Sequence, residues 1–412
     1  MTIADRAQEP AAATDRRLPG IEAHPHARAL LLPAIEPGAS PSHAYLFHGP
    51  AGTGKRTIAR SFAAALLAED PARVDATAER IERDSHPDLT WVRPSGASEM
   101  LVGDIEEPVV AAAARTPFES ARRVFVIEAV DTMTEEAANR MLKTLEEPPA
   151  FVHLLLLTDR RDDVLETIAS RCQAVRFDPL APALVAERLE RGGTERATAL
   201  ACARLALGDA GFAEHLASDA GETLRAGAES FICAVLAGAT EERPWTALLG
   251  AAKASGERAG AHAEEQLAAR LELVPAKERK REEREALVDR RRVERRERTR
   301  TLEQGLRLAE LWLRDLLCLV EEAPELIHAV DRLSELEGLA ELEGPGDVER
   351  PGEVESTDTR AHAGARVSID RDYLHTAMEL TTDTRLSLAQ NVSEELALEA
   401  LAYRLAIGPR SG

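Results

Sequence analysis

The sequence predicts an α/β protein in which a parallel five-stranded sheet is covered by helices and followed by an all-helical C-terminal part. Five short apolar runs alternate with Ala- and Leu-rich segments of helical period, which is typical of strands buried on both faces of a parallel sheet. A glycine-rich loop follows the first run, and strand-like runs end after Pro179. The five runs are Tyr45–Phe47, Leu89–Val92, Val124–Ile127, Val152–Leu157 and Ala174–Phe177.

Four parts are expected along the 412 residues. The first is a polar tail without apolar periodicity, which predicts disorder. An α/β domain carrying the glycine-rich loop comes next, and then a small helical lid broken at Gly192-Gly193 and Gly208. The remainder is all helical, with a Pro-, Gly- and acid-rich loop before the last predicted helix, Val392–Leu405. The parts are residues 1–20, 21–180, 181–219 and 220–412, and the loop is residues 344–364.

Composition excludes several classes of function. The formal net charge of −21 repels polyanions, so the chain is not expected to bind DNA on its own, and an aromatic share of 3% argues against stacking platforms for single strands. Four widely spaced cysteines fit neither a disulfide framework nor a metal site, which indicates a reducing cytoplasm. No signal peptide or apolar run of roughly 18 residues is present, so no membrane contact is predicted.

Residues 48–57 have the pattern of a phosphate-binding loop that follows a strand and opens a helix. Its glycines allow backbone N–H groups to face phosphate oxygens, and Lys55 would reach the outer phosphates. Arg56 occupies the place of the Ser or Thr whose hydroxyl ligates Mg²⁺, which argues against a metal. The predicted nucleotide-binding residues are Gly49, Gly52, Thr53, Gly54, Lys55, Arg56 and Thr57.

The third predicted strand ends in Glu128-Ala129, which predicts a site that does not hydrolyse ATP. Glu128 stands where a carboxylate would hold a metal, but Ala129 replaces the acid that orients the attacking water. Asp131 is interpreted as the cap of the next helix rather than as a catalytic base. Binding of ATP or ADP without hydrolysis and no binding at all both remain open.

In these residues and in the stretches named below, the sequence resembles the bacterial DNA polymerase III clamp loader, an AAA+ family, and within it the delta prime subunits. The resemblance covers residues 21–179 well and extends loosely to Leu405. The matching stretches are Ser42–Phe47, His86–Asp88, Ala137–Asn139, Leu142–Pro149 and Ile168–Gln173.

The resemblance implies roles for single residues. Arg171, in Ser170-Arg171-Cys172, would act in trans on the ATP of a neighbouring subunit, where such an arginine is worth about 10³ to 10⁵ in rate. The alternative is a surface arginine paired with a carboxylate such as Glu166. Thr158 fits a polar sensor position, and Phe212 stands near the place of a lid arginine. Relatives often carry a four-cysteine zinc module, but residues 69–88 contain no cysteine, so no zinc is predicted.

The resemblance also implies a function and partners. The expected function is that of a non-hydrolysing structural and regulatory subunit, within the polymerase III holoenzyme and the bacterial replisome of the cytoplasm, without polymerase or significant ATPase activity of its own. The expected partners are the delta and gamma/tau subunits in a heteropentamer held by a C-terminal collar, and indirectly the sliding clamp and primer-template DNA. The alternatives are an active AAA+ ATPase, gamma/tau-like or another motor such as a branch-migration helicase, and a nucleotide-sensing adaptor outside replication.

Two features of the C-terminal part allow more than one interpretation. Residues 277–300 carry twelve basic and seven acidic side chains, which suits either contact with DNA or a solvated helix with opposite charges at helical spacing. An apolar stripe then recurs at steps of three and four residues, which fits packing within the chain or between subunits. The stripe is Leu302, Leu306, Ala309, Leu313, Leu316 and Val320.

Overall fold

The computed structural model describes residues 18–68, 70–94, 99–273, 279–340, 370–388 and 392–407, in two compact units. We call the first the P-loop unit; it consists of Met1–Ala181 together with Leu207–Ala210. We call the second the helical unit; it consists of Pro182–Ala206 and Gly211–Gly412. Each unit is described by itself.

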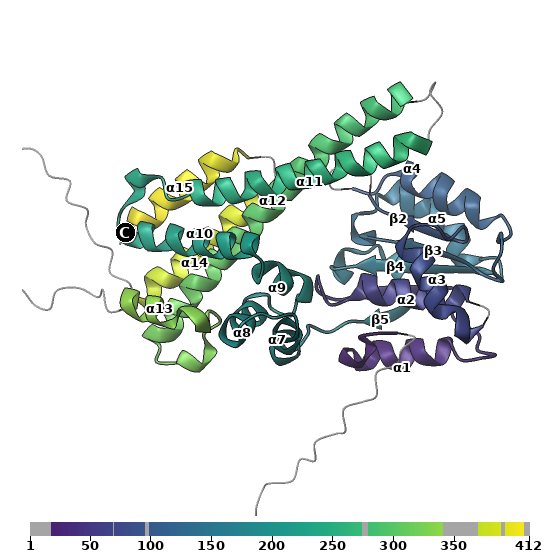
Figure 1. The fold of residues 1–412 in the computed structure, drawn as a ribbon, viewed down its shortest axis with the longest axis horizontal. Helices are drawn as coiled ribbons and strands as arrows, with labels where there is room; N and C mark the ends of the chain where they lie inside the picture. The colour runs from purple at the N-terminus through teal and green to yellow at the C-terminus, as the bar shows by residue number, and fades with distance from the viewer. Residues whose placement is uncertain are drawn as a thin grey trace, which may run out of the picture. The chain divides into compact units, whose positions relative to one another are not determined.

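The P-loop unit is built on a five-stranded sheet in the order β2-β3-β4-β1-β5, in which every pairing is parallel (Figure 1). Strands β1, β3 and β4 are buried at every position, as the apolar runs predict for a sheet covered on both faces. The predicted parallel sheet is confirmed, with each strand within one residue of its expected bounds. The strands are β1 (Ala44–His48), β2 (Leu89–Val92), β3 (Arg123–Ile127), β4 (Val152–Thr158) and β5 (Gln173–Arg176).

Helices cover the two faces of this sheet and create two hydrophobic cores (Figure 1). Alternate strand residues point to opposite faces, so Phe47 packs with the first set of helices and Leu46 with the second. One face carries α1 (Pro25–Ala34), α2 (Lys55–Leu67) and α3 (Val74–Glu82); the other carries α4 (Val102–Ile105), η3 (Glu106–Ala111), α5 (Glu135–Glu146) and α6 (Glu166–Ala169).

The first hydrophobic core extends closer to the N-terminus than predicted. Leu18 is fully buried in the first core, together with Ile21 of the short helix η1 (Ile21–Ala23). The expected tail of residues 1–20 is therefore too long at its C-terminal end, because an apolar side chain two residues before Gly20 closes the core beside β5. Residues 1–17 lie outside the described part.

Two or three short helices are expected between residues 181 and 219; the structure has three there, followed by longer ones. Residues 341–369, which include the predicted loop, lie outside the described residues. None of the described helices has the length and apolar character needed to cross a bilayer. The helices are α7 (Pro182–Arg191), α8 (Arg196–Leu205), α9 (Ala210–Leu216), α10 (Asp219–Leu236), α11 (Thr246–Leu273), α12 (Arg279–Val320), α13 (Leu333–Ala340), α14 (Arg371–Leu388) and α15 (Glu394–Ile407).

Helices α11 and α12 run side by side as a long hairpin (Figure 1). Gly256 and Gly260 of α11 allow the close approach, because a Cβ at Gly256 would lie 2.9 Å from the backbone oxygen of Glu294, and one at Gly260 2.2 Å from a carboxylate oxygen of Glu294. Arg290 pairs with Glu264 across the hairpin and with Glu294 along α12. Such pairs match the interpretation of residues 277–300 as a helix with opposite charges at helical spacing.

The apolar stripe of α12 is buried within the chain. Leu302, Leu306 and Ala309 are fully buried, Leu313 and Leu316 are nearly so, and only Val320 is half-buried. Helix α12 packs against α10, α11 and α14. Packing within the chain therefore accounts for this stripe, so it supplies no surface for a partner.

Candidate phosphate-binding site

The loop between β1 and α2 has the backbone shape of a phosphate cradle. Gly49, Gly52 and Gly54 all have positive φ angles, of 142°, 67° and 88°. A Cβ at Gly49 would lie 2.0 Å from the carbonyl oxygen of Phe177, and one at Gly52 would lie 1.6 Å from a carboxylate oxygen of Asp209. Conformation favours glycine at both positions, and at Gly49 the backbone of Phe177 also leaves no room for a side chain.

Lys55 lies inside the cradle and is only 6% exposed. Its Nζ donates to the carbonyl oxygens of Gly49 and Pro50 at 2.6 and 2.5 Å, and pairs with Asp159 at 2.7 Å. Burial lowers the pKa of Lys55, while the hydrogen bond and charge of Asp159 act in the opposite direction. The ammonium group of Lys55 therefore lies where a bound phosphate would contact it, and the carboxylate of Asp159 already takes one of its contacts.

Arg56 forms an ion pair with the carboxylate that a metal would need. Its Nη2 lies 2.5 Å from Oε2 of Glu128, a side chain that is 5% exposed. The second oxygen, Oε1, accepts from Nε1 of Trp91 at 2.6 Å and from Nε of Arg93 at 3.1 Å. We call Arg56, Arg93, Trp91 and Glu128 the guanidinium clasp. Two cations and an indole thus use both oxygens of the one acidic side chain at the end of β3.

The residues at this position do not fit Mg²⁺. Both oxygens of Glu128 are engaged, and the residue after Lys55 supplies a cation where a metal-ligating hydroxyl would be required. The following Thr57 is exposed, one residue further along α2. Among the described residues, no group of three or more His, Cys, Asp or Glu side chains could hold a metal ion.

The residues after Glu128 are arranged differently from the sequence-based interpretation. Ala129 has a left-handed backbone, with φ 53°. Asp131 does not cap a helix: Thr134 caps α5 by accepting from the backbone of Ala137. The prediction was wrong because Asp131 falls in a short 3-10 turn, where its carboxylate accepts from Oγ1 of Thr158 at 2.8 Å and pairs with Arg160 at 3.2 Å. Thr158 is therefore held at the end of β4.

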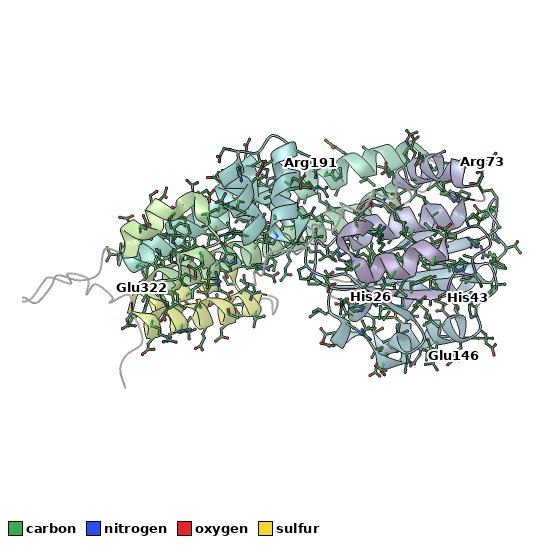
Figure 2. All side chains as sticks on the ribbon, turned by 90° about the horizontal axis from the view of Figure 1, so that it is seen from below. His26, His43, Arg73, Glu146, Arg191 and Glu322 are labelled. Atoms are coloured by element: carbon green, nitrogen blue, oxygen red, sulfur yellow. The ribbon has the colours of Figure 1, made fainter. Side chains whose placement is uncertain are left out.

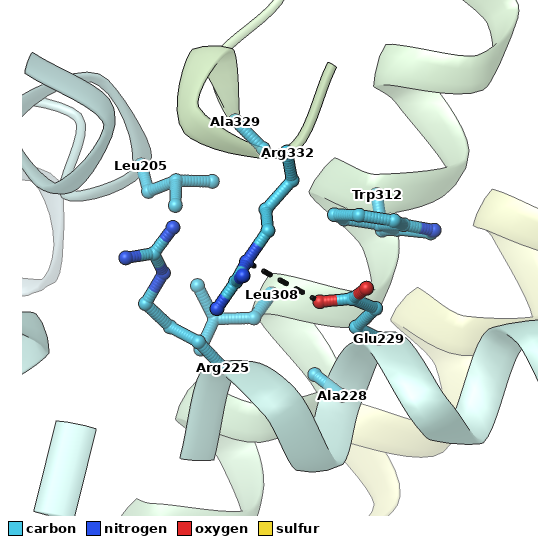
Figure 3. Close-up of a pocket in the computed structure, with 8 residues that line it drawn as sticks. All are labelled: Leu205, Arg225, Ala228, Glu229, Leu308, Trp312, Ala329 and Arg332. Atoms are coloured by element: carbon cyan, nitrogen blue, oxygen red, sulfur yellow. Dashed lines mark ion pairs between the residues drawn. The ribbon is translucent and has the colours of Figure 1, made fainter. Parts of the chain in front are cut away.

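Arg171 lies on the surface of the P-loop unit, with 36% of its side chain exposed. Its Nε donates to Oε1 of Glu146 at 2.9 Å, and its Nη1 donates to the carbonyl oxygen of Thr167 at 3.0 Å. Figure 2 shows Glu146 at the edge of the unit. The predicted alternative partner, Glu166, is not the carboxylate that the guanidinium contacts; Glu146, at the end of α5, takes that position.

The His86-Pro87-Asp88 stretch acts as a structural anchor. The fully buried carboxylate of Asp88 accepts from the backbone N–H groups of Phe118, Glu119 and Ser120 at 2.6 to 2.9 Å. Burial would raise the pKa of Asp88, but these three hydrogen bonds lower it below its ordinary value. The anchor holds the loop that enters β3 and keeps Phe118 76% exposed.

Sequence reasoning missed the partners of the cradle. Arg93, Asp159 and Asp209 belong to no motif, and only the ends of strands β2 and β4 hint at the first two, because carboxyl ends of parallel strands share one edge of a sheet. Phe212, considered for the lid, is 4% exposed in α9 of the helical unit and stacks near His215. Phe212 has no charged group that could contact a phosphate as a lid arginine would.

A family model matches most of the P-loop unit, and several known proteins are similar to part of this chain. Residues 27–181 match the family model described as "DNA polymerase III, delta subunit". The chain is 37% identical over 174 residues to the DNA polymerase III subunit delta' of Bacillus subtilis, covering 41% of this chain and 51% of that one. It is 37% identical over 136 residues to the delta' subunit of Pseudomonas aeruginosa, covering 32% and 42%.

Similarity also extends to another subunit of the same polymerase. The subunit tau of Bacillus subtilis is 32% identical over 158 residues, covering 36% of this chain and 27% of tau. The chain thus spans about half or less of each of these relatives. A solved gamma subunit-related protein from Thermotoga maritima aligns with 93% of this chain and 99% of its own at 17% identity, with a TM-score of 0.38, too low for a conclusion about the fold.

Proposed function

We propose that this chain, whose P-loop unit is that of a clamp-loader delta prime-like protein, serves the bacterial DNA polymerase III clamp loader as a subunit that does not hydrolyse ATP. In this role it assembles with delta and gamma/tau subunits and helps to place the sliding clamp on primed DNA. It contributes to ATP turnover by presenting Arg171 to the nucleotide of a neighbouring subunit.

The guanidinium clasp is the observation that carries the proposal. Hydrolysis by a P-loop enzyme needs a metal held beside the phosphates and a group that orients water. Here both oxygens of Glu128 are engaged by Arg56, Arg93 and Trp91, and Ala129 has no group that could act on water. The cradle retains its shape without these two elements of hydrolysis.

Arg171 is accessible enough to act in trans. It is tied to Glu146 by a pair in which both side chains are partly exposed. Pairs of this kind contribute only about 0 to 1 kcal/mol, because water and salt screen them. A phosphate with developing charge, in a site from which water is excluded, would outcompete Glu146 for the guanidinium.

The last helix offers a surface for neighbouring subunits. Helix α15 buries one face within the chain through Leu398, Leu401 and Leu405. Its other face exposes a second apolar stripe at helical spacing, namely Leu396, Ala400, Tyr403 and Ile407. A helix that is apolar on both faces is typical of a buried position, which supports a collar contact with other subunits.

Reconstitution with gamma/tau and delta tests the proposal. Arg171→Ala should lower turnover at the neighbouring site by about 10³-fold or more while the complex still assembles. The control is Arg176→Ala, which removes another arginine of the same region, paired with Asp178. Unchanged ATP turnover with Arg171→Ala would contradict the role in trans, and a chain that stays monomeric beside these subunits would contradict the function.

An active gamma/tau-like ATPase is the second candidate. It is favoured by the 32% identity with tau and by the glycine cradle with Lys55 in place. The isolated chain distinguishes the two: steady ATP turnover abolished by Lys55→Ala would establish an ATPase, whereas turnover at the background level in both proteins supports the delta prime-like role.

A further inference from the structure

We infer that Arg56 stands in for the divalent cation of this phosphate loop, so that a nucleoside di- or triphosphate binds here in its metal-free form. The inference rests on the proposed non-hydrolysing character of the site. It adds the chemical form of the ligand and the residue that selects it.

The clasp engages both oxygens of the carboxylate that a metal would need. Oε2 of Glu128 lies 2.5 Å from Nη2 of Arg56, and Oε1 receives both the Trp91 indole and the Arg93 guanidinium. These contacts make Glu128, buried at 4% exposure, a counter-ion of arginine. A divalent cation would have to break a charge-assisted hydrogen bond to reach either oxygen.

The charge of the clasp also opposes a metal and favours an anion. Two guanidinium groups face one carboxylate, so a net positive charge remains beside the cradle. A magnesium ion would meet two like charges at close range, whereas phosphate oxygens would meet two cations together with Lys55. The guanidinium clasp therefore keeps a net positive charge without any bound ion, whereas Lys55 is paired with Asp159.

Arginine suits a phosphate for geometric reasons. Its guanidinium carries five N–H donors in a planar fork, and Nη2 of Arg56 lies 2.5 Å from Oε2 of Glu128. The Arg56 side chain is 70% exposed at the first turn of α2, where backbone N–H groups also point at the loop. Arg56 can thus hold Glu128 with one nitrogen and offer the rest of its fork to phosphate oxygens.

The anion that now contacts Lys55 is exchangeable. Asp159 is 57% exposed, and its carboxylate lies 2.7 Å from Nζ of Lys55. An incoming phosphate would replace this carboxylate on the same cation, and Asp159 would turn to solvent. Binding is then an exchange of one anion for another on Lys55, and no metal takes part.

Titration of the full chain with ADP tests the inference, with affinity measured by calorimetry in EDTA and again in excess Mg²⁺. The wild-type protein should bind ADP in EDTA at least as tightly as in Mg²⁺. Arg56→Thr restores a hydroxyl and releases Oε2 of Glu128, so its affinity in EDTA should fall about tenfold, the loss expected for one charge-assisted hydrogen bond. Mg²⁺ should then improve binding to this variant.

Arg73→Thr is the matched control: it removes the same charge from an exposed position of the P-loop unit, labelled in Figure 2, and should behave as the wild type. Wild-type affinity that rises tenfold with Mg²⁺, or no binding in either buffer, would overturn the inference. Either result leaves assembly with gamma/tau and delta intact, whereas failure of the proposed function would abolish assembly and leave the Mg²⁺ response unchanged.

Discussion

Asp88→Ala should destabilise the P-loop unit by about 3 kcal/mol. The substitution removes a fully buried carboxylate and leaves the backbone N–H groups of Phe118, Glu119 and Ser120 without their acceptor. A hydrogen bond to a charged group is worth about 1.5 to 3 kcal/mol, but these amides are close enough to the surface for water to replace part of that, so about 1 kcal/mol each remains. Asp88→Asn should lose about half as much, because Oδ2 accepts two of the three bonds and one amide oxygen can replace it.

Urea unfolding measures the loss of stability, and hydrogen exchange measures it at the three amides themselves. The amides of residues 118–120 should exchange much faster in Asp88→Ala than in the wild type. Because the folded state lowers the pKa of Asp88, its contribution is present above the ordinary aspartate pKa of about 4 and is lost as pH falls through the lower folded value. Asp162→Ala, at an exposed position, should change the unfolding free energy by less than about 0.5 kcal/mol. Unchanged exchange at residues 118–120 in Asp88→Ala would refute the anchor.

Two further predictions concern the cradle and the hairpin. Asp159→Ala should tighten ADP binding about tenfold, because the phosphate no longer competes with a carboxylate for Lys55. The control, Asp162→Ala, should leave the affinity for ADP unchanged. Titration calorimetry measures both variants, and equal affinities would show that Asp159 does not compete with the phosphate. In α11, Gly256→Ala should destabilise the helical unit by about 1 to 3 kcal/mol, because the new Cβ meets the backbone of Glu294. Gly250→Ala, which has open space around it, should stabilise the unit by up to about 1 kcal/mol. Urea unfolding measures both free energies, and two changes of the same sign would contradict the close approach of the helices.

The strands and the phosphate loop could be predicted from sequence because their signals are local. Continuous apolar runs identify buried parallel strands, and the glycines reveal the loop directly. The paired charges could not be predicted, because Arg56 meets Glu128 only after β4 has paired with both β1 and β3 in the sheet. Sequence reasoning identified the loss of the hydroxyl at position 56, and the structure shows what the arginine does instead.

The errors have the same origin. Asp131 was taken for a cap because a short polar residue before a helix usually is one, but Asp131 lies inside the 3-10 turn Val130–Thr132, and Thr134 caps the helix that follows. Leu18 was assigned to the tail because its neighbours are polar, although one apolar side chain is enough to close the core. For Arg171, Glu166 is near in sequence and Glu146 is near in space.

Strand β5 fixes the distance between Arg171 and the phosphate loop of the P-loop unit. Arg171 stands two residues before the strand, and Phe177, directly after it, holds Gly49 of the cradle by close contact. Because β5 is paired with β1 along its length, the span from Arg171 to Phe177 is an inextensible spacer of no more than roughly 20 Å. In an assembly, this spacer would set the distance between the subunit's own phosphate loop and the nucleotide of its neighbour, so a one-residue insertion in β5 would misplace Arg171 without touching either site.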